Sequence, residues 1–250
     1  MTPQAPAPTQ APALPAWQRA LRWATLAGLG AAAALTAVVL QRYPGGERAN
    51  AATVAFGTLA IGSLSLLTVG MWWSAGHART SEARRALALG TTAGLAAGAL
   101  WLAEISFNNV LPPDVSVPHR DLVDNLFWLA TVLLTLAAAT VAGWRGGSVR
   151  AGVLAGAWAG LLSGLIACLY GLALVVFRLD LILRDPLAQA EFAVRGPSSA
   201  TPDMATYFAR DTAAGALGHL VLLGVIVGLL LGALGGGIGA LAAHGRRRGG

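Results

Sequence analysis

The stretch at residues 213–243, AAGALGHLVLLGVIVGLLLGALGGGIGALAA, is the longest apolar run in the chain and decides the fold. It contains one ionisable side chain, that of His219. About 20 apolar residues are enough for an α-helix to cross the hydrocarbon core of a bilayer. The stretch therefore predicts a transmembrane helix and, with it, an integral membrane protein.

The composition of the whole chain agrees with a membrane location. Hydrophobic residues make up 56% of the chain and charged residues only 11%. Soluble domains carry about 25% charged residues, so an ordinary soluble protein is excluded. The net charge of +6 would favour a nucleic-acid partner in a soluble protein, but the arginines lie in short segments between apolar runs. Membrane topology explains them better, so we expect the lipid bilayer, and not nucleic acid, as the partner.

Five further apolar runs are each long enough to cross a membrane as a helix: residues 21–40, 51–75, 86–107, 122–144 and 151–177. In lipid, only helices and closed β-barrels satisfy all of their backbone hydrogen bonds. The short alternating strands of a barrel are not present in the sequence. The predicted fold class is all-α, a polytopic membrane protein with a bundle of six transmembrane helices.

This single domain is predicted to cover residues 17–244, between two short tails. Residues 1–16 are rich in proline and alanine and have no charged side chain, which predicts disorder. A cleaved signal peptide is an alternative for this end, but the first apolar run exceeds the usual signal core of roughly 7–15 residues. An uncleaved first span is therefore favoured. Residues 245–250 form a basic tail.

The distribution of arginine predicts the orientation. The segments on one side of the six spans carry ten arginines against one acidic residue, Glu82, whereas the other side carries seven arginines against ten acidic residues. An excess of arginine in short loops marks the cytoplasmic side. Both termini are therefore predicted to be cytoplasmic, in a cell membrane, with the loop at residues 178–212 outside.

A helix start is visible near the end of that loop. Thr201, Pro202 and Asp203 suit an N-cap, a first helical turn and the positive end of the helix dipole, in that order. We expect a helix that begins near Pro202, with Thr201 as its N-cap, and that continues into the sixth span.

Glycines recur at intervals of four in three of the predicted spans. This spacing places them on one stripe of a helix, where a neighbouring backbone can approach closely. Static packing inside the bundle is the favoured interpretation; a mobile or pore-lining interface and the seam of a homo-oligomer or of a membrane partner subunit are the alternatives. The predicted packing glycines are Gly90, Gly94, Gly98, Gly152, Gly156, Gly160, Gly164, Gly224, Gly228, Gly232 and Gly236.

Polar residues collect near the predicted outer ends of spans three, four and six: Glu104, Asn108, Asn109, Asp121, Asp124, Asn125, Asp211 and His219. Glu104 and Asn108 are one helical turn apart and continue the glycine face of their span. A carboxyl group inside a membrane is costly without a partner, so it indicates a functional site. Alternatively, the helix ends near Phe107 and Glu104 reaches lipid headgroups or an external arginine.

The acidic residues of the fourth span have a simpler alternative role. Asp121, Asp124 and Asn125 lie on one helix face, and a carboxylate in a first turn is favoured by the helix dipole. Capping therefore explains Asp121 well. A pair formed by Glu104 and Asp124 near Arg120 could instead bind a cation or share a proton.

In the sixth span, Asp211, Gly215 and His219 follow one another at intervals of four. A histidine at this depth could relay protons because its ordinary pKa is close to neutral pH. The alternative is a hydrogen bond to a neighbouring helix.

Two classes of function follow from these patterns. In the first, the polar residues form an outer-leaflet site that binds or moves a small solute or ion; in the second, the protein is a non-catalytic component that packs through its glycine faces. The bundle resembles a rhomboid-type protease only superficially, through Ser163, Gly164 and His219. Leu161 stands where that family has glycine. In addition, Ser163 is expected to lie on the order of 10 Å deeper in the membrane than His219. The single Cys168 and the absence of metal or phosphate motifs predict no metal, no cofactor and no catalytic residue.

Overall fold

The computed structural model describes residues 16–45, 47–76, 80–109, 117–199, 201 and 203–248, and these residues are helical apart from short turns, with no strand among them. The helices are α1 (Ala16–Arg42), α2 (Glu47–Gly76), α3 (Ser81–Asn109), α4 (Val117–Gly146), α5 (Val149–Leu183), α6 (Pro186–Arg195), α7 (Met204–Val221) and α8 (Gly228–Arg248), with a 3₁₀ turn at Gly196–Ser198 and a π-helical turn at Leu222–Val227. Of the predicted tail at residues 1–16, Ala16 is the first residue of α1, and residues 1–15 lie outside the described residues, as does Pro202.

Five helical segments are long and apolar enough to cross a membrane: Ala16–Arg42, Ser81–Asn109, His119–Gly146, Val149–Leu183 and Met204–Arg246. Helix α2 adds a shorter apolar segment, Gly57–Gly70. The prediction of an all-α membrane bundle is therefore confirmed, and the protein is a multi-pass integral membrane protein.

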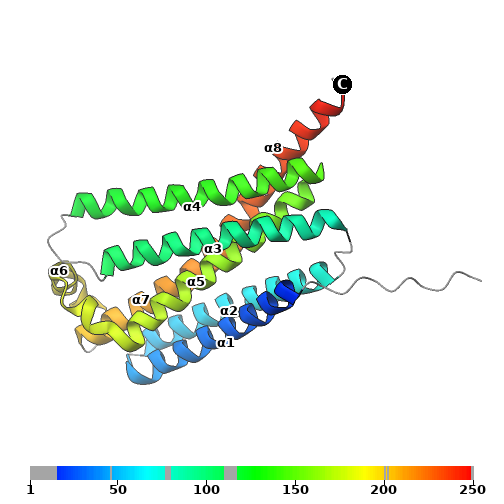
Figure 1. Ribbon diagram of the computed structural model, residues 1–250. Coiled ribbons are helices and arrows are strands. Elements are labelled where there is room, and N and C mark those ends of the chain that lie inside the picture. The colour runs from blue at the N-terminus through cyan, green and yellow to red at the C-terminus, as the bar shows by residue number, and fades with distance from the viewer. Residues whose placement is uncertain are drawn as a thin grey trace, which may run out of the picture.

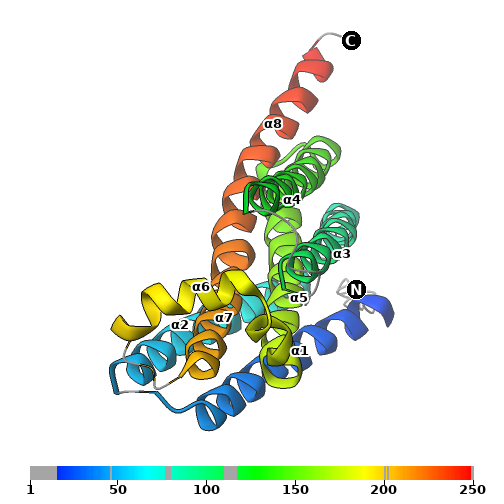
Figure 2. The same cartoon turned by 90° about the vertical axis from the view of Figure 1, so that its left-hand side faces the viewer.

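Successive long helices run in opposite directions across the bundle (Figure 1). The turn between α1 and α2, the ends of α3 and α5, and helix α6 lie at one end, and the C-terminus lies at the other. Viewed along the bundle, α5 lies in the middle, with α1, α3, α4 and α7 around it (Figure 2). We call the end that carries α6 the α6 end.

Helix α5 is central because its residues are apolar or small on every side. Leu161, Leu172 and Val175 have no exposed surface. Large apolar side chains on the outer helices, such as Leu66, Leu133 and Leu241, are instead exposed. An apolar exterior of this kind suits contact with lipid, where leucine costs nothing to expose.

The glycine stripes bring helix backbones together within this one chain. A Cβ atom added to Gly90 of α3 would lie 2.5 Å from the carbonyl oxygen of Ala155 in α5, and one added to Gly156 of α5 would lie 2.5 Å from the Cα of Gly232 in α8. Gly152 faces Gly236 even more closely. The stripes of α3 and α8 thus both pack against α5.

Two helix starts differ from the predictions. The N-cap of α7 is Asp203, not Thr201: its Oδ1 accepts a hydrogen bond from the Thr206 backbone N–H (2.8 Å) and its Oδ2 accepts one from the Thr206 hydroxyl (3.0 Å). Asp203 can satisfy both donors because a carboxylate has two acceptor oxygens. Helix α4 begins at Val117, so Asp121 lies beyond its first turn, and the prediction that Asp121 caps this helix is wrong.

The loop at residues 178–212 is more ordered than its sequence indicated. Helix α5 continues to Leu183 through a kink at Arg178, and α6 follows with Asp185 as its N-cap and Pro186 in its first turn. As predicted, the helix that follows this loop, which starts at Met204, continues into the sixth span. This span is interrupted by the π-helical turn, which begins three residues after His219. Such turns inside α-helices are frequent at functional sites.

Candidate functional site

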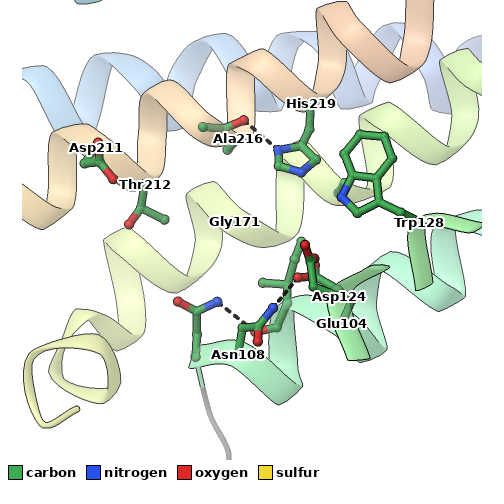
Figure 3. A pocket seen from close by; sticks show the side chains of 13 residues that line it. Glu104, Asn108, Asp124, Trp128, Gly171, Asp211, Thr212, Ala216 and His219 are labelled. Atoms are coloured by element: carbon green, nitrogen blue, oxygen red, sulfur yellow. Dashed lines mark hydrogen bonds between the residues drawn. The ribbon is translucent and has the colours of Figure 1, made fainter. Parts of the chain in front are cut away.

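A cavity of about 350 Å³ lies between α3, α4, α5 and α7 (Figure 3). Asn109, the last residue of α3, lines it, so the cavity reaches towards the α6 end of the bundle. Six of the eight predicted polar site residues line this one cavity: Glu104, Asn108, Asn109, Asp124, Asp211 and His219.

Glu104 is the most deeply placed acid of the cavity, with 7% of its surface exposed. It is held by Asn108, one turn further along α3, whose Nδ2 donates a hydrogen bond to Glu104 Oε1. Asp124 of α4 lies beside them (Figure 3). In the described part of the chain, no arginine lies within ion-pair distance of Glu104, so none of the described arginines is the external partner that was the alternative.

Three aromatic rings close the inner side of the cavity. The ring centroids of Trp101 and Trp128 are 4.8 Å apart, and those of Trp101 and His219 are 5.0 Å apart, both in edge-to-face arrangements. The Trp128 and His219 centroids are 6.1 Å apart. Trp128 and His219 line the cavity, and Trp101 is buried behind them.

The spacing of these two tryptophans in the sequence places each of them close to an acid of the cavity. Trp101 precedes Glu104 by three residues, and Trp128 follows Asp124 by four. Residues at these spacings are neighbours on one helix face. On both α3 and α4, therefore, an indole and a carboxylate share the face that looks towards the other helix.

His219 is held within its own helix. Its Nδ1 lies 2.8 Å from the carbonyl oxygen of Gly215. Because a carbonyl oxygen can only accept, Nδ1 carries the hydrogen atom of this bond. Nδ1 therefore does not form the hydrogen bond to a neighbouring helix that was the alternative role of His219.

The rest of the α7 wall is small or polar. Gly215 lies between Asp211 and His219, and a Cβ atom added to it would meet nothing within 4 Å. Arg210, the neighbour of Asp211 in sequence, points elsewhere: it is buried, and its Nε donates a hydrogen bond to the Tyr43 carbonyl oxygen (2.8 Å) beyond the end of α1.

Two predicted site residues do not reach the cavity. Asp121 and Asn125 are exposed, and the Asn125 amide donates to the Asp121 carbonyl oxygen (2.7 Å) of its own helix. Asp124 alone of this group lines the cavity. One face of a helix is wide enough for residues at its two edges to have different neighbours, and the spacing could not show which edge meets α3.

Arg120, near which the Glu104 and Asp124 pair was expected, contacts Asn108 and forms an ion pair with Asp185. Its Nη1 donates to Asp185 Oδ2 at 2.5 Å and to the Asn108 carbonyl oxygen at 3.4 Å. The Arg120 and Asp185 side chains are only 13% and 16% exposed, so this ion pair is largely shielded from solvent. It ties α4 to the start of α6, so the charge of Arg120 is paired with Asp185 and not with Glu104 or Asp124.

The hydroxyl of Ser163 is engaged within α5, and the expected difference in depth between Ser163 and His219 stays a prediction. Gly164, the neighbour of Ser163, packs against the turn that contains the His219 carbonyl oxygen. The Ser163 hydroxyl donates to the Gly160 carbonyl oxygen of its own helix at 3.1 Å. A serine–histidine hydrogen bond, which nucleophilic catalysis requires, is not formed by this hydroxyl.

The charge of the cavity is one-sided. Glu104, Asp124 and Asp211 are acidic, and His219 is the one basic side chain among the described lining residues. No cluster of three or more histidine, cysteine or acidic side chains suited to a metal ion is found in the described part of the chain.

Comparisons with known proteins add no assignment. The chain matches no protein-family model, no curated protein and no solved structure. Function must therefore be argued from the cavity itself, with its buried acid, its second carboxylate and its aromatic wall.

Proposed function

We propose that this membrane protein binds a small cation in the cavity between α3, α4, α5 and α7 and moves it across the membrane. The observation that carries the proposal is the placement of Glu104, a buried acid that lies beside a second carboxylate, Asp124, in the wall of a cavity. Burying carboxylates side by side is costly unless they share a proton or a positive charge compensates them. None of the described arginines supplies that charge to Glu104, so a cation from outside the chain is the fitting partner.

The orientation is part of the proposal. Since arginine is concentrated in the segments at the opposite end of the bundle, we place that end and both termini in the cytoplasm. The α6 end then faces outwards, and the cavity is an outer-leaflet site. The exposed Asp211 at its margin would attract cations towards Glu104.

The packing role that the glycine stripes suggested is satisfied inside one chain. Gly90 and Gly156 meet α5 and α8 backbone, respectively, with no room for another helix. These faces are therefore not available to a second copy or to a partner subunit, which favours the cavity over the glycines as the functional feature.

The proposal is tested by the substitution Glu104→Gln in proteoliposomes. Glutamine keeps the oxygen that accepts the Asn108 hydrogen bond and removes only the charge. Rapid changes in sodium chloride or methylammonium chloride concentration should produce a charge-displacement current on a solid-supported membrane with the wild type. We expect Glu104→Gln to weaken cation binding by at least about tenfold, which is about 1.4 kcal/mol, and so to reduce this current strongly.

The matched control is Glu82→Gln, at the opposite end of the same helix. Its carboxylate accepts a hydrogen bond from the Ser148 hydroxyl (2.6 Å), which the amide oxygen can also accept. This variant should keep the wild-type current. Equal currents from wild type and Glu104→Gln, or no current from the wild type with either salt, would contradict the proposed function.

A further inference from the structure

We infer that the cation of this cavity is a small organic ammonium ion rather than a metal ion. The inference rests on the proposed function and specifies the ligand of the same site. It is carried by the combination of carboxylates and aromatic rings in one wall. A site for any cation would need the carboxylates, but it would not need the aromatic rings.

The wall repeats one arrangement on two helices. Glu104 lies one turn from Trp101 on α3, and Asp124 lies one turn from Trp128 on α4. The two indoles contact each other edge to face, and His219 of α7 packs against both. A cation held by the carboxylates is thus within a helical turn of an aromatic surface.

The buried indole of Trp101 supports the aromatic rings that line the cavity. Trp101 is 1% exposed, and its Nε1 has no hydrogen-bond partner among the described residues. Its ring packs against Trp128 and His219, the two aromatic side chains that line the cavity. Trp101 therefore fixes the rings that a ligand would meet.

This combination suits an ammonium ion with carbon substituents. The ammonium charge is attracted by carboxylates and by the faces of aromatic rings, and tryptophan is the strongest of the aromatic partners. Its methyl or methylene groups pack against the apolar part of the wall, which includes Ile105, Ala167 and Ala216.

A metal ion is served less well by the same wall. Calcium takes six to eight oxygen ligands and magnesium about six in an octahedron. The cavity offers the oxygens of Glu104 and Asp124 and further polar side chains, but Trp128, Ile105 and small apolar residues occupy part of its lining and bring no ligand for a metal ion. His219 Nδ1 is also committed to the Gly215 carbonyl oxygen.

The volume limits the size of the ligand. Ligand sites usually range from about 300 to 1,000 Å³, and this cavity of about 350 Å³ is at the lower limit. An ammonium ion with a few carbon atoms fits, whereas a large multi-ring amine does not.

The test uses tetramethylammonium chloride and sodium chloride as probes, in separate calorimetric titrations of the full chain in lipid nanodiscs at matched ionic strength. We expect tetramethylammonium to bind at least about tenfold more tightly than sodium. Trp128→Leu keeps an apolar side chain but removes the aromatic face, and it should weaken tetramethylammonium binding by about 3- to 30-fold. Sodium binding should change less than twofold.

Trp128→Phe is the matched variant, since it keeps an aromatic face and should retain most of the tetramethylammonium affinity. It also keeps the test decisive if the leucine variant fails to fold. The organic-ammonium inference would be overturned if sodium bound as tightly as tetramethylammonium or more tightly, and if neither variant changed tetramethylammonium binding. The proposed cation site would then still stand. If neither probe binds and neither salt gives a current, the proposed function fails and this inference fails with it.

Discussion

Replacing Gly156 with leucine is expected to prevent correct assembly of the bundle. Even the first carbon of the new side chain would lie 2.5 Å from the Gly232 Cα and 2.6 Å from the Gly228 carbonyl oxygen. Both are backbone atoms of α8, which cannot rotate away as a side chain could. Helices α5 and α8 would have to separate along their shared face, and we expect a loss of more than about 3 kcal/mol of folding free energy.

The measurement is size-exclusion chromatography and thermal unfolding of the detergent-solubilised protein. Gly30→Leu is the control, because a Cβ added to this exposed glycine of α1 meets nothing within 4 Å. The control should yield the wild-type elution peak and a similar melting temperature. A monodisperse Gly156→Leu protein that melts within a few degrees of the control would show that α5 and α8 do not meet as described.

Filling the cavity is expected to abolish cation binding without unfolding the protein. Gly215 lines the cavity, and space is open beyond it for at least 4 Å. A leucine at this position can therefore be accommodated, but its side chain would project into the space between Asp211 and His219. We expect Gly215→Leu to weaken cation binding by at least about tenfold, which is about 1.4 kcal/mol, and so to lower the cation-dependent current in proteoliposomes strongly.

Folding must be shown separately for this variant. Its elution profile and melting temperature should resemble those of Gly30→Leu, which adds the same side chain on a surface away from the cavity. Full current from a folded Gly215→Leu protein would mean that the cation does not use this cavity.

The sequence was sufficient for the fold class because lipid imposes simple rules. Long apolar runs had to become helices, since nothing else in the hydrocarbon satisfies the backbone. The glycine spacing also led to the correct helix face, although it did not identify the partner. Gly90 meets α5 and Gly156 meets α8, and these pairings depend on tertiary structure that a single helix does not encode.

Helix ends were harder to predict because several residues compete for each cap. Thr201 and Asp203 are both good N-caps, and the choice between them depends on where the Thr206 backbone N–H and hydroxyl lie. In the same way, Val117 lies before the apolar run that marked the fourth span, and the earlier start of α4 removes Asp121 from the first turn.

The candidate site was predicted in part. Angular reasoning placed Glu104 and Asn108 on the inner face, and the structure places both in the cavity. It could not predict that Arg120 would pair with Asp185, because α6 was not expected. The aromatic wall was missed because Trp101 and Trp128 were considered apart from the acids that share their faces.

The most direct test of a water-filled site open at the α6 end is thiol labelling of Gly215→Cys in whole cells. The native Cys168 has no exposed surface, so it should not react with the reagent. A membrane-impermeant, positively charged methanethiosulfonate added outside should label Gly215→Cys, and excess tetramethylammonium should slow the reaction. Gly30→Cys, on the lipid-facing surface of α1, should remain unlabelled. No labelling of Gly215→Cys from outside, or labelling only after the cytoplasmic side is opened, would contradict the account.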